Sequence, residues 1–76
     1  MKDQYQFIHF EQQFFPGRAT TVWICRNNKS NISLGIVAWN GGWRQYCFYP
    51  EREMVFSSGC LADIQDFIRQ LKEERK

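Results

Sequence analysis

Three thiols and one imidazole are the side chains of this sequence with the strongest intrinsic chemistry. Cys25, Cys47 and Cys60 lie far apart without a Cys-x-x-Cys pair, and His9 is the only histidine. A cysteine beside a histidine can act as a nucleophile, but no spacing here places His9 next to a thiol. Zinc sites usually draw their ligands from close pairs, which are missing as well. We therefore expect free, partly buried thiols, with no metal and no other cofactor.

Other catalytic patterns are missing from the sequence too. The segment Asn40-Gly41-Gly42 lies between two apolar runs, which is typical of a hairpin, and does not open a helix as a phosphate-binding loop does. A chain of 76 residues also leaves little room for a substrate pocket of several hundred Å³. The sequence predicts a protein that is not an enzyme.

Aromatic side chains, which make up 17% of the chain, offer binding chemistry instead. Aromatic rings beside arginines stack on the bases of single-stranded nucleic acid, and the same residue types dominate protein–protein hot spots. The candidate binding residues are Trp23, Arg26, Trp39, Trp43, Arg44 and Tyr46. In so small a chain the tryptophans can equally serve the core.

The charge balance helps to separate the two kinds of partner. Ten Lys and Arg oppose eight Asp and Glu, which gives a net charge of +2 and a pI near 8.6. This value is below the pI of about 9 that is typical of dedicated nucleic-acid binders. We therefore expect contacts with a protein partner or with a second copy of the chain, and keep single-stranded nucleic acid as the alternative.

The sequence gives no indication of a membrane or of secretion. No apolar run approaches the roughly 20 residues of a membrane span, and the first residues lack the apolar core of a signal peptide. We expect a cytoplasmic protein that does not bind membranes.

Short elements must position the candidate residues within a single domain over residues 1–76, because so short a chain supports one hydrophobic core. Segments rich in aromatic and β-branched residues alternate with turn residues. The strands are expected at residues 5–11, 20–26, 32–39, 43–49 and 54–56. Apolar residues then recur with helical spacing from Leu61 to Leu71, which predicts an amphipathic helix over residues 61–74.

This order of elements predicts an α+β fold: an antiparallel β-meander of four or five strands with one C-terminal α-helix packed on one face. Gly35 inside its strand indicates a bulge or the close approach of a neighbour. Alternation places Leu34, Ile36 and Ala38 on the face opposite Gly35, Val37 and Trp39, without deciding which face the helix covers. Because both faces of the hairpin carry large apolar groups and one helix cannot cover them all, we expect some aromatic side chains to remain accessible.

Two stretches of the sequence carry a resemblance to known proteins. Residues 41–50 contain Trp43-Arg44-Gln45-Tyr46, and residues 55–68 contain Cys60-Leu61-Ala62-Asp63-Ile64. This Trp-Arg-x-Tyr and Cys-Leu-x-Asp-Ile pattern resembles a group of small uncharacterised proteins carried by phages and prophages. The resemblance implies a phage or bacterial cytosolic origin, in the host cell if the chain is phage-encoded, but no established activity and no functional residues.

Overall fold

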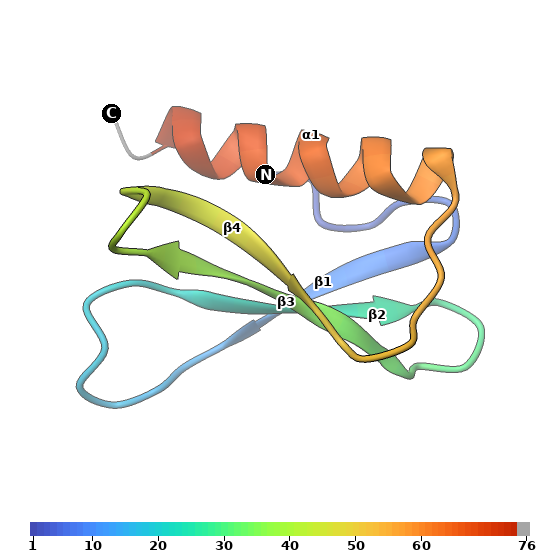
Figure 1. Ribbon diagram of the computed structural model, residues 1–76, viewed down its shortest axis with the longest axis horizontal. Helices are drawn as coiled ribbons and strands as arrows, with labels where there is room; N and C mark the ends of the chain where they lie inside the picture. The colour runs from blue at the N-terminus through green and yellow to red at the C-terminus, as the bar shows by residue number, and fades with distance from the viewer. Residues whose placement is uncertain (75–76) are drawn as a thin grey trace.

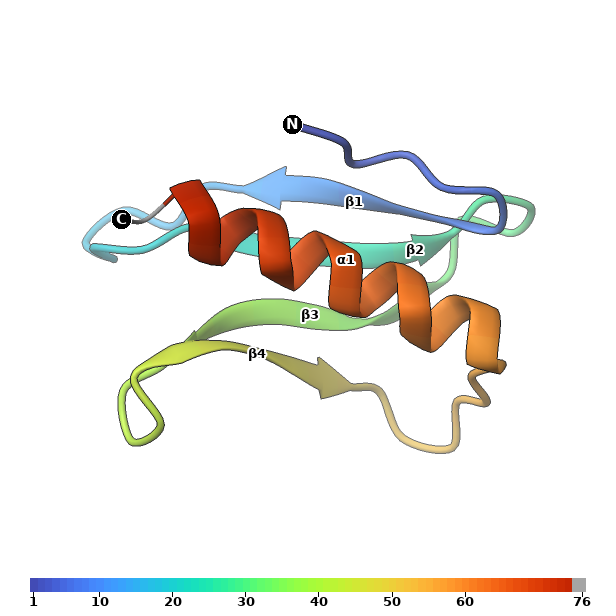
Figure 2. The ribbon, with the colours of Figure 1, turned by 90° about the horizontal axis from the view of Figure 1, so that it is seen from above.

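The computed structural model describes residues 1–74 and contains one sheet and one helix (Figure 1). Its elements are β1 (Ile8–Gln13), β2 (Val22–Asn27), β3 (Ser33–Asn40), β4 (Gln45–Pro50) and α1 (Ser58–Glu74). The four strands are antiparallel neighbours in the order β1-β2-β3-β4, and α1 lies across one face of the sheet (Figure 2). The α+β meander with a C-terminal helix is thereby confirmed, with four strands.

The prediction of a strand at residues 54–56 was wrong, because these residues form no strand. Pro50 ends β4, Glu53 adopts a positive φ of 61°, and the chain then turns toward the helix layer instead of pairing with β4. The ring of Phe56 packs edge-on against that of Phe48, with 5.4 Å between the centroids. Packing under α1 therefore takes the place of a fourth set of backbone pairs.

The strand expected from residue 43 begins at Gln45, because the turn after β3 is longer than an Asn-Gly pair alone requires. The Asn40 side-chain oxygen accepts a hydrogen bond from the Trp43 backbone N–H at 2.8 Å. The Asn40 backbone carbonyl accepts one from the Arg44 backbone N–H at 2.7 Å. Arg44 adopts a positive φ of 56°. Trp43 and Arg44 thus belong to the turn and not to β4.

The first strand also begins later than expected, at Ile8. Residues 3–7 turn back beside β1: Tyr5 N–H donates to the Ile8 carbonyl at 2.9 Å, and Phe10 N–H donates to the Asp3 carbonyl at 2.8 Å. Gln4 and His9 form a further antiparallel bridge. The N-terminal segment therefore covers part of the outer edge of β1.

The helix begins at Ser58, earlier than expected, because Ser57 caps it. The Ser57 hydroxyl accepts a hydrogen bond from Cys60 N–H at 3.2 Å, and its carbonyl accepts one from Leu61 N–H at 3.0 Å. A serine at this position satisfies backbone donors that have no partner within the helix.

The core lies between α1 and the sheet. The helix contributes Ile64, Phe67 and Leu71, all nearly inaccessible to solvent. Phe67 is stacked on Phe10, with 4.0 Å between ring centroids and 3° between planes, and meets the ring of Trp23 edge-on at 5.0 Å. The apolar stripe predicted for the helix therefore faces the sheet.

A bulge changes the alternation within β3. Ser33 pairs with Arg26 but Gly35 pairs with Cys25, so one extra residue, Leu34, lies between them. Leu34 therefore joins the buried cluster under the helix rather than the face of Ile36 that alternation predicted. A Cβ on Gly35 would lie 2.6 Å from the Tyr49 carbonyl oxygen, so the bulge and the close approach indicated by this glycine are both present.

Candidate functional site

Register places four of the six candidate binding residues on two different faces of the sheet, and the other two lie in the β3–β4 turn. Trp23, Trp39 and Tyr46 lie on the covered face, the face that α1 packs against, because they share it with Val37 and Phe48. Arg26 lies on the opposite face, next to His9 across the β1–β2 pair. An aromatic and arginine platform on one side of the sheet is therefore not formed.

The aromatic residues of the covered face make internal contacts. Trp23 is half-buried against Phe67, and its indole Nε1 is buried without a hydrogen-bond partner. Trp39 and Tyr46 meet edge-on with 5.5 Å between ring centroids. Trp23 and Tyr46 also line a shallow depression of about 390 Å³ beside Leu71, near the C-terminal end of α1. These rings serve the packing between helix and sheet.

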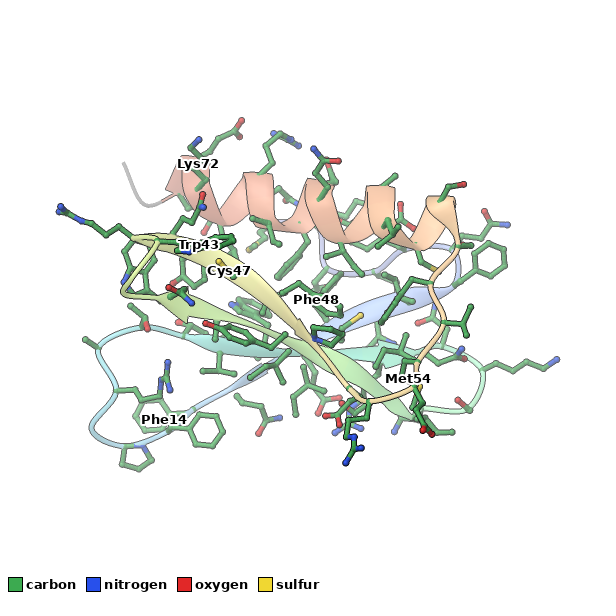
Figure 3. All side chains as sticks on the ribbon, in the orientation of Figure 1. Phe14, Trp43, Cys47, Phe48, Met54 and Lys72 are labelled. Carbon is green, nitrogen blue, oxygen red and sulfur yellow. The ribbon has the colours of Figure 1, made fainter. Side chains whose placement is uncertain are left out.

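Trp43 and Arg44 lie together at the β3–β4 turn. The Trp43 side chain is 73% exposed, whereas Trp23 and Trp39 are half-buried. Figure 3 shows Trp43 at the end of the sheet where the helix ends. This turn therefore presents the exposed indole of the chain together with an exposed guanidinium group.

Arg26 is held by groups of its own chain. Its Nε lies 3.3 Å from a carboxylate oxygen of Glu11, and one terminal nitrogen donates to the Asn31 carbonyl at 3.1 Å. Only 23% of its side chain is exposed. These contacts leave Arg26 little freedom to neutralise a phosphate.

Sequence reasoning did not select the apolar row on the side of the sheet away from α1. On the side away from α1, Ile24 pairs with Ile36, and Ile36 pairs with Tyr49, in one row across three strands. Val22, Ala38 and Cys47 lie beside this row. We call this side the open face, because neither a helix nor a strand covers it (Figure 1). The alternation of apolar residues carried this signal, but the face covered by the helix had to be known first.

The surroundings of the open face are apolar as well as charged. Phe14, 85% exposed, lies on this side of the sheet in the loop between β1 and β2 (Figure 3). The ion pair between Glu11 and Arg26 borders the row at β1 and β2. At the β4 end of the row, the Tyr49 hydroxyl accepts a hydrogen bond from the Asn40 side-chain amide at 2.9 Å. An apolar centre with polar groups at its rim resembles the anatomy of protein interfaces.

The thiols and the histidine do not form a common site in the described residues. Burial, and to a smaller extent the nearby Cys60, raises the pKa of Cys25 to about 12. His9 lies on the open face, where its Nδ1 is 2.6 Å from the Asn28 side-chain oxygen, whereas Cys25 lies on the covered face. Among residues 1–74, no three His, Cys, Asp or Glu side chains gather closely enough to hold a metal ion.

Comparison with known proteins relates the chain to a small phage protein. The chain is 32% identical over 71 residues to the "Uncharacterized 9.3 kDa protein" of Acholeplasma phage L2, which covers 93% of this chain and 91% of the phage protein. The chain belongs to the family of this phage protein. No protein-family model matches it, and no solved structure matches it. Within the described part of the chain, α1 is too short and too polar to cross a membrane.

Proposed function

We propose that this phage-family protein is a non-enzymatic binding module that contacts other proteins through the open face of its sheet. The observation that carries the proposal is the row of Ile24, Ile36 and Tyr49, which no other element covers. A sheet with one face packed and the other in water usually carries polar residues on its outer face, whereas here the centre of that face is apolar. The contacts are expected in the cytoplasm of the host cell.

The charges of the open face support a protein partner over a nucleic acid. Arg26 is already paired with Glu11, so this face offers little positive charge to a phosphate backbone. Apolar groups with a polar rim, by contrast, gain free energy when a complementary protein surface removes them from water.

A single charge placed on the open face tests the proposal. Ile24→Lys introduces an ammonium group into the middle of β2, and Gln65→Lys makes a cationic change at an exposed position of α1. Wild type and both variants serve as bait in a host-cell lysate, and a retained protein is then purified and titrated by calorimetry. We expect Ile24→Lys to raise the Kd at least about tenfold, which is typical of an interface hot spot, and Gln65→Lys to leave it within about twofold.

Two outcomes would contradict the open-face proposal. One is that no protein is retained by the wild-type chain above the level of an unrelated bait. The other is that a retained partner binds Ile24→Lys as tightly as wild type. Burying a lysine ammonium group without a partner at the centre of an interface costs free energy, so the affinity should fall if Ile24 lies there. Circular dichroism of each variant checks that the fold is intact.

A second candidate function, binding of single-stranded nucleic acid, rests on the exposed Trp43 beside Arg44. Stacking on a base quenches indole fluorescence, and a phosphate contact weakens as salt rises. A titration with a mixed-sequence oligonucleotide should then quench the emission of wild type at low salt but not that of Trp43→Ala. An unchanged wild-type spectrum at high protein concentration would remove this candidate.

A further inference from the structure

The two edges of the sheet are treated differently. The N-terminal segment covers part of the β1 edge, through the Phe10–Asp3 backbone hydrogen bond and the Gln4–His9 bridge. Within residues 1–74 the β4 edge has no such cover, because the connection from β4 to α1 leaves the end of the strand and does not return beside it (Figure 2). Monomeric proteins usually protect an open edge with charges, a bulge or a covering segment.

β4 lacks most of these protective devices. It carries no Lys, Arg, Asp or Glu between Gln45 and Pro50, and its six pairs with β3 continue without a bulge. Proline occurs only at its last residue. The strand is therefore a regular, uncharged and largely aromatic edge, suited to pairing with another strand.

The pairing with β3 fixes which backbone groups of β4 point outward. Glu51 N–H donates to the Leu34 carbonyl, and Pro50, opposite Gly35, has no N–H to donate. Because antiparallel residues alternate between hydrogen-bonded and non-hydrogen-bonded pairs, Gln45, Cys47 and Tyr49 bond to β3. Tyr46 and Phe48 then direct their N–H and C=O groups away from the sheet, and no hydrogen bond within residues 1–74 reaches these groups.

We propose that the β4 edge pairs with the β4 edge of a second copy of the chain, which joins two four-stranded sheets into one antiparallel sheet across a twofold axis. Tyr46 of one copy forms the hydrogen-bonded pair with Phe48 of the other, and the reverse pair follows by symmetry. Cys47 lies on the axis opposite its own counterpart. The proposal uses the edge and not the open face, so it goes beyond the function proposed above and does not depend on it.

Pro50 excludes a register in which the twofold axis is shifted toward the end of β4. If the strands were shifted so that Phe48 faced its own counterpart, Pro50 would lie opposite Tyr46 in a hydrogen-bonded pair. Its ring would then occupy the place of the missing N–H, against the carbonyl of Tyr46. With Cys47 on the axis, Pro50 faces the turn residue Arg44 and lies outside the paired segment.

The chemistry of the strand favours a second copy as the occupant. Self-pairing places Tyr46 beside Phe48 twice on the covered face, and aromatic cross-strand pairs stabilise antiparallel sheets. It brings no like charges together, because β4 has none. An isologous contact of this kind closes on itself, so it satisfies both open edges without forming a fibre.

The position of Cys47 provides a direct test. Opposite residues in a non-hydrogen-bonded pair have Cα atoms about 4.5 Å apart, within the range of a disulfide. Mild oxidation of the full-length chain by copper phenanthroline should convert two Cys47 thiols of a dimer into one disulfide, with the electrons passing to the oxidant. We expect a covalent dimer from wild type and from Cys60→Ala, and none from Cys47→Ala.

Backbone variants and sedimentation test the same edge without cross-linking. Tyr46→Pro removes an outward N–H, whereas Tyr46→Ala removes the same ring and keeps that N–H. We expect sedimentation to give a dimer Kd for Tyr46→Pro that is at least about tenfold above that of Tyr46→Ala, because two hydrogen bonds are lost across the axis. Ile24→Lys, on the open face, should leave the dimer unchanged.

Three results would overturn the edge pairing. The first is a wild-type chain that sediments as a monomer at every concentration. The second is a dimer whose Cys47 thiols do not cross-link under conditions that oxidise them. The third is a dimer that is lost in Ile24→Lys and kept in Tyr46→Pro, which would assign self-association to the open face. Loss of partner binding with an intact β4 dimer would instead contradict only the function proposed above.

Discussion

Gly35 lies against the backbone of β4, where there is no room for a Cβ atom. A Cβ at this position would lie 2.6 Å from the Tyr49 carbonyl oxygen and 2.9 Å from Pro50 Cα, which are backbone atoms that cannot rotate away. We expect Gly35→Ala to lower the free energy of unfolding by about 1–3 kcal/mol, as overpacking does.

Urea unfolding of Gly35→Ala measures this effect, with Gly41→Ala as the matched control. Gly41 has open space around its Cα and no positive φ, so its replacement should change stability by less than about 0.5 kcal/mol. Equal stability of Gly35→Ala and wild type would mean that the two strands separate more easily than their register indicates.

Cys25 illustrates how burial controls reactivity at the scale of one side chain. The residue is fully buried, and burial raises the pKa of its thiol to about 12, so the nucleophilic thiolate is scarce at neutral pH. We expect iodoacetamide at pH 8 to label Cys60, which is half-buried, faster than Cys25, and both at similar rates in urea. Peptide mapping by mass spectrometry measures the two rates. Equal rates in the folded protein would contradict the burial of Cys25.

At the scale of elements, the Ser57 cap determines where α1 begins. Its hydroxyl accepts a hydrogen bond from Cys60 N–H, which has no partner within the helix. We expect Ser57→Ala to lower the free energy of unfolding by about 1 kcal/mol, because the cap is lost. Ser58→Ala, one residue further and inside the helix, is the matched control and should not destabilise. Thermal and urea unfolding compare the two, and equal losses would show that Ser57 does not act as a cap.

The elements were largely predictable from the sequence, and their ends were not. The pattern of Ile64, Phe67 and Leu71 identified the helix, because burial against the sheet imposes helical spacing. By contrast, the apolar run Met54–Phe56 resembled a strand, although Phe56 serves the core from an irregular segment. Apolar composition indicates burial but not backbone pairing, so a short run of three residues does not distinguish the two.

The candidate site was less predictable than the fold, because it depends on which face the helix covers. Alternation sorted side chains into two sets, and Trp23 was selected for its type although it packs under α1. Ile24 and Ile36 carry no chemical distinction, and they form a row on the face away from α1 only when three strands align. Trp43 was selected for its type in the same way, and it is exposed because it lies in the β3–β4 turn rather than in a strand under α1.

At the scale of the whole molecule, the N-terminal segment joins the two layers. The Tyr5 hydroxyl donates to an Asp66 carboxylate oxygen at 2.8 Å and accepts a hydrogen bond from the Gln70 amide at 3.0 Å. The Gln70 amide nitrogen also donates a hydrogen bond to the Lys2 carbonyl, and the Gln70 amide oxygen accepts one from Lys2 N–H. These contacts hold the segment that covers the β1 edge against α1, so the cover of one edge depends on the helix.

This connection makes stability depend on pH in the alkaline range. Burial and the hydrogen bond to Asp66 raise the pKa of Tyr5 above its ordinary value of about 10, because a phenolate would be desolvated beside a carboxylate. The unfolded chain then loses this proton at a lower pH than the folded chain. The stabilisation that Tyr5 gives to the folded state is fully present below pH 10. It is lost as the pH rises toward the pKa of Tyr5 in the folded chain.

Tyr5→Phe removes this titrating group and keeps the ring that meets Phe10 edge-on. We expect wild type to be more stable than Tyr5→Phe at pH 8 because of its hydrogen bonds, and this advantage to shrink steadily between pH 10 and pH 11.5. Urea unfolding at each pH gives the difference, in which the other tyrosines and cysteines cancel because both chains contain them. A constant difference across this range would show that Tyr5 titrates alike in the folded and unfolded chains. In that case the hydrogen bond from Tyr5 to Asp66 would not help to hold the segment covering β1 against α1.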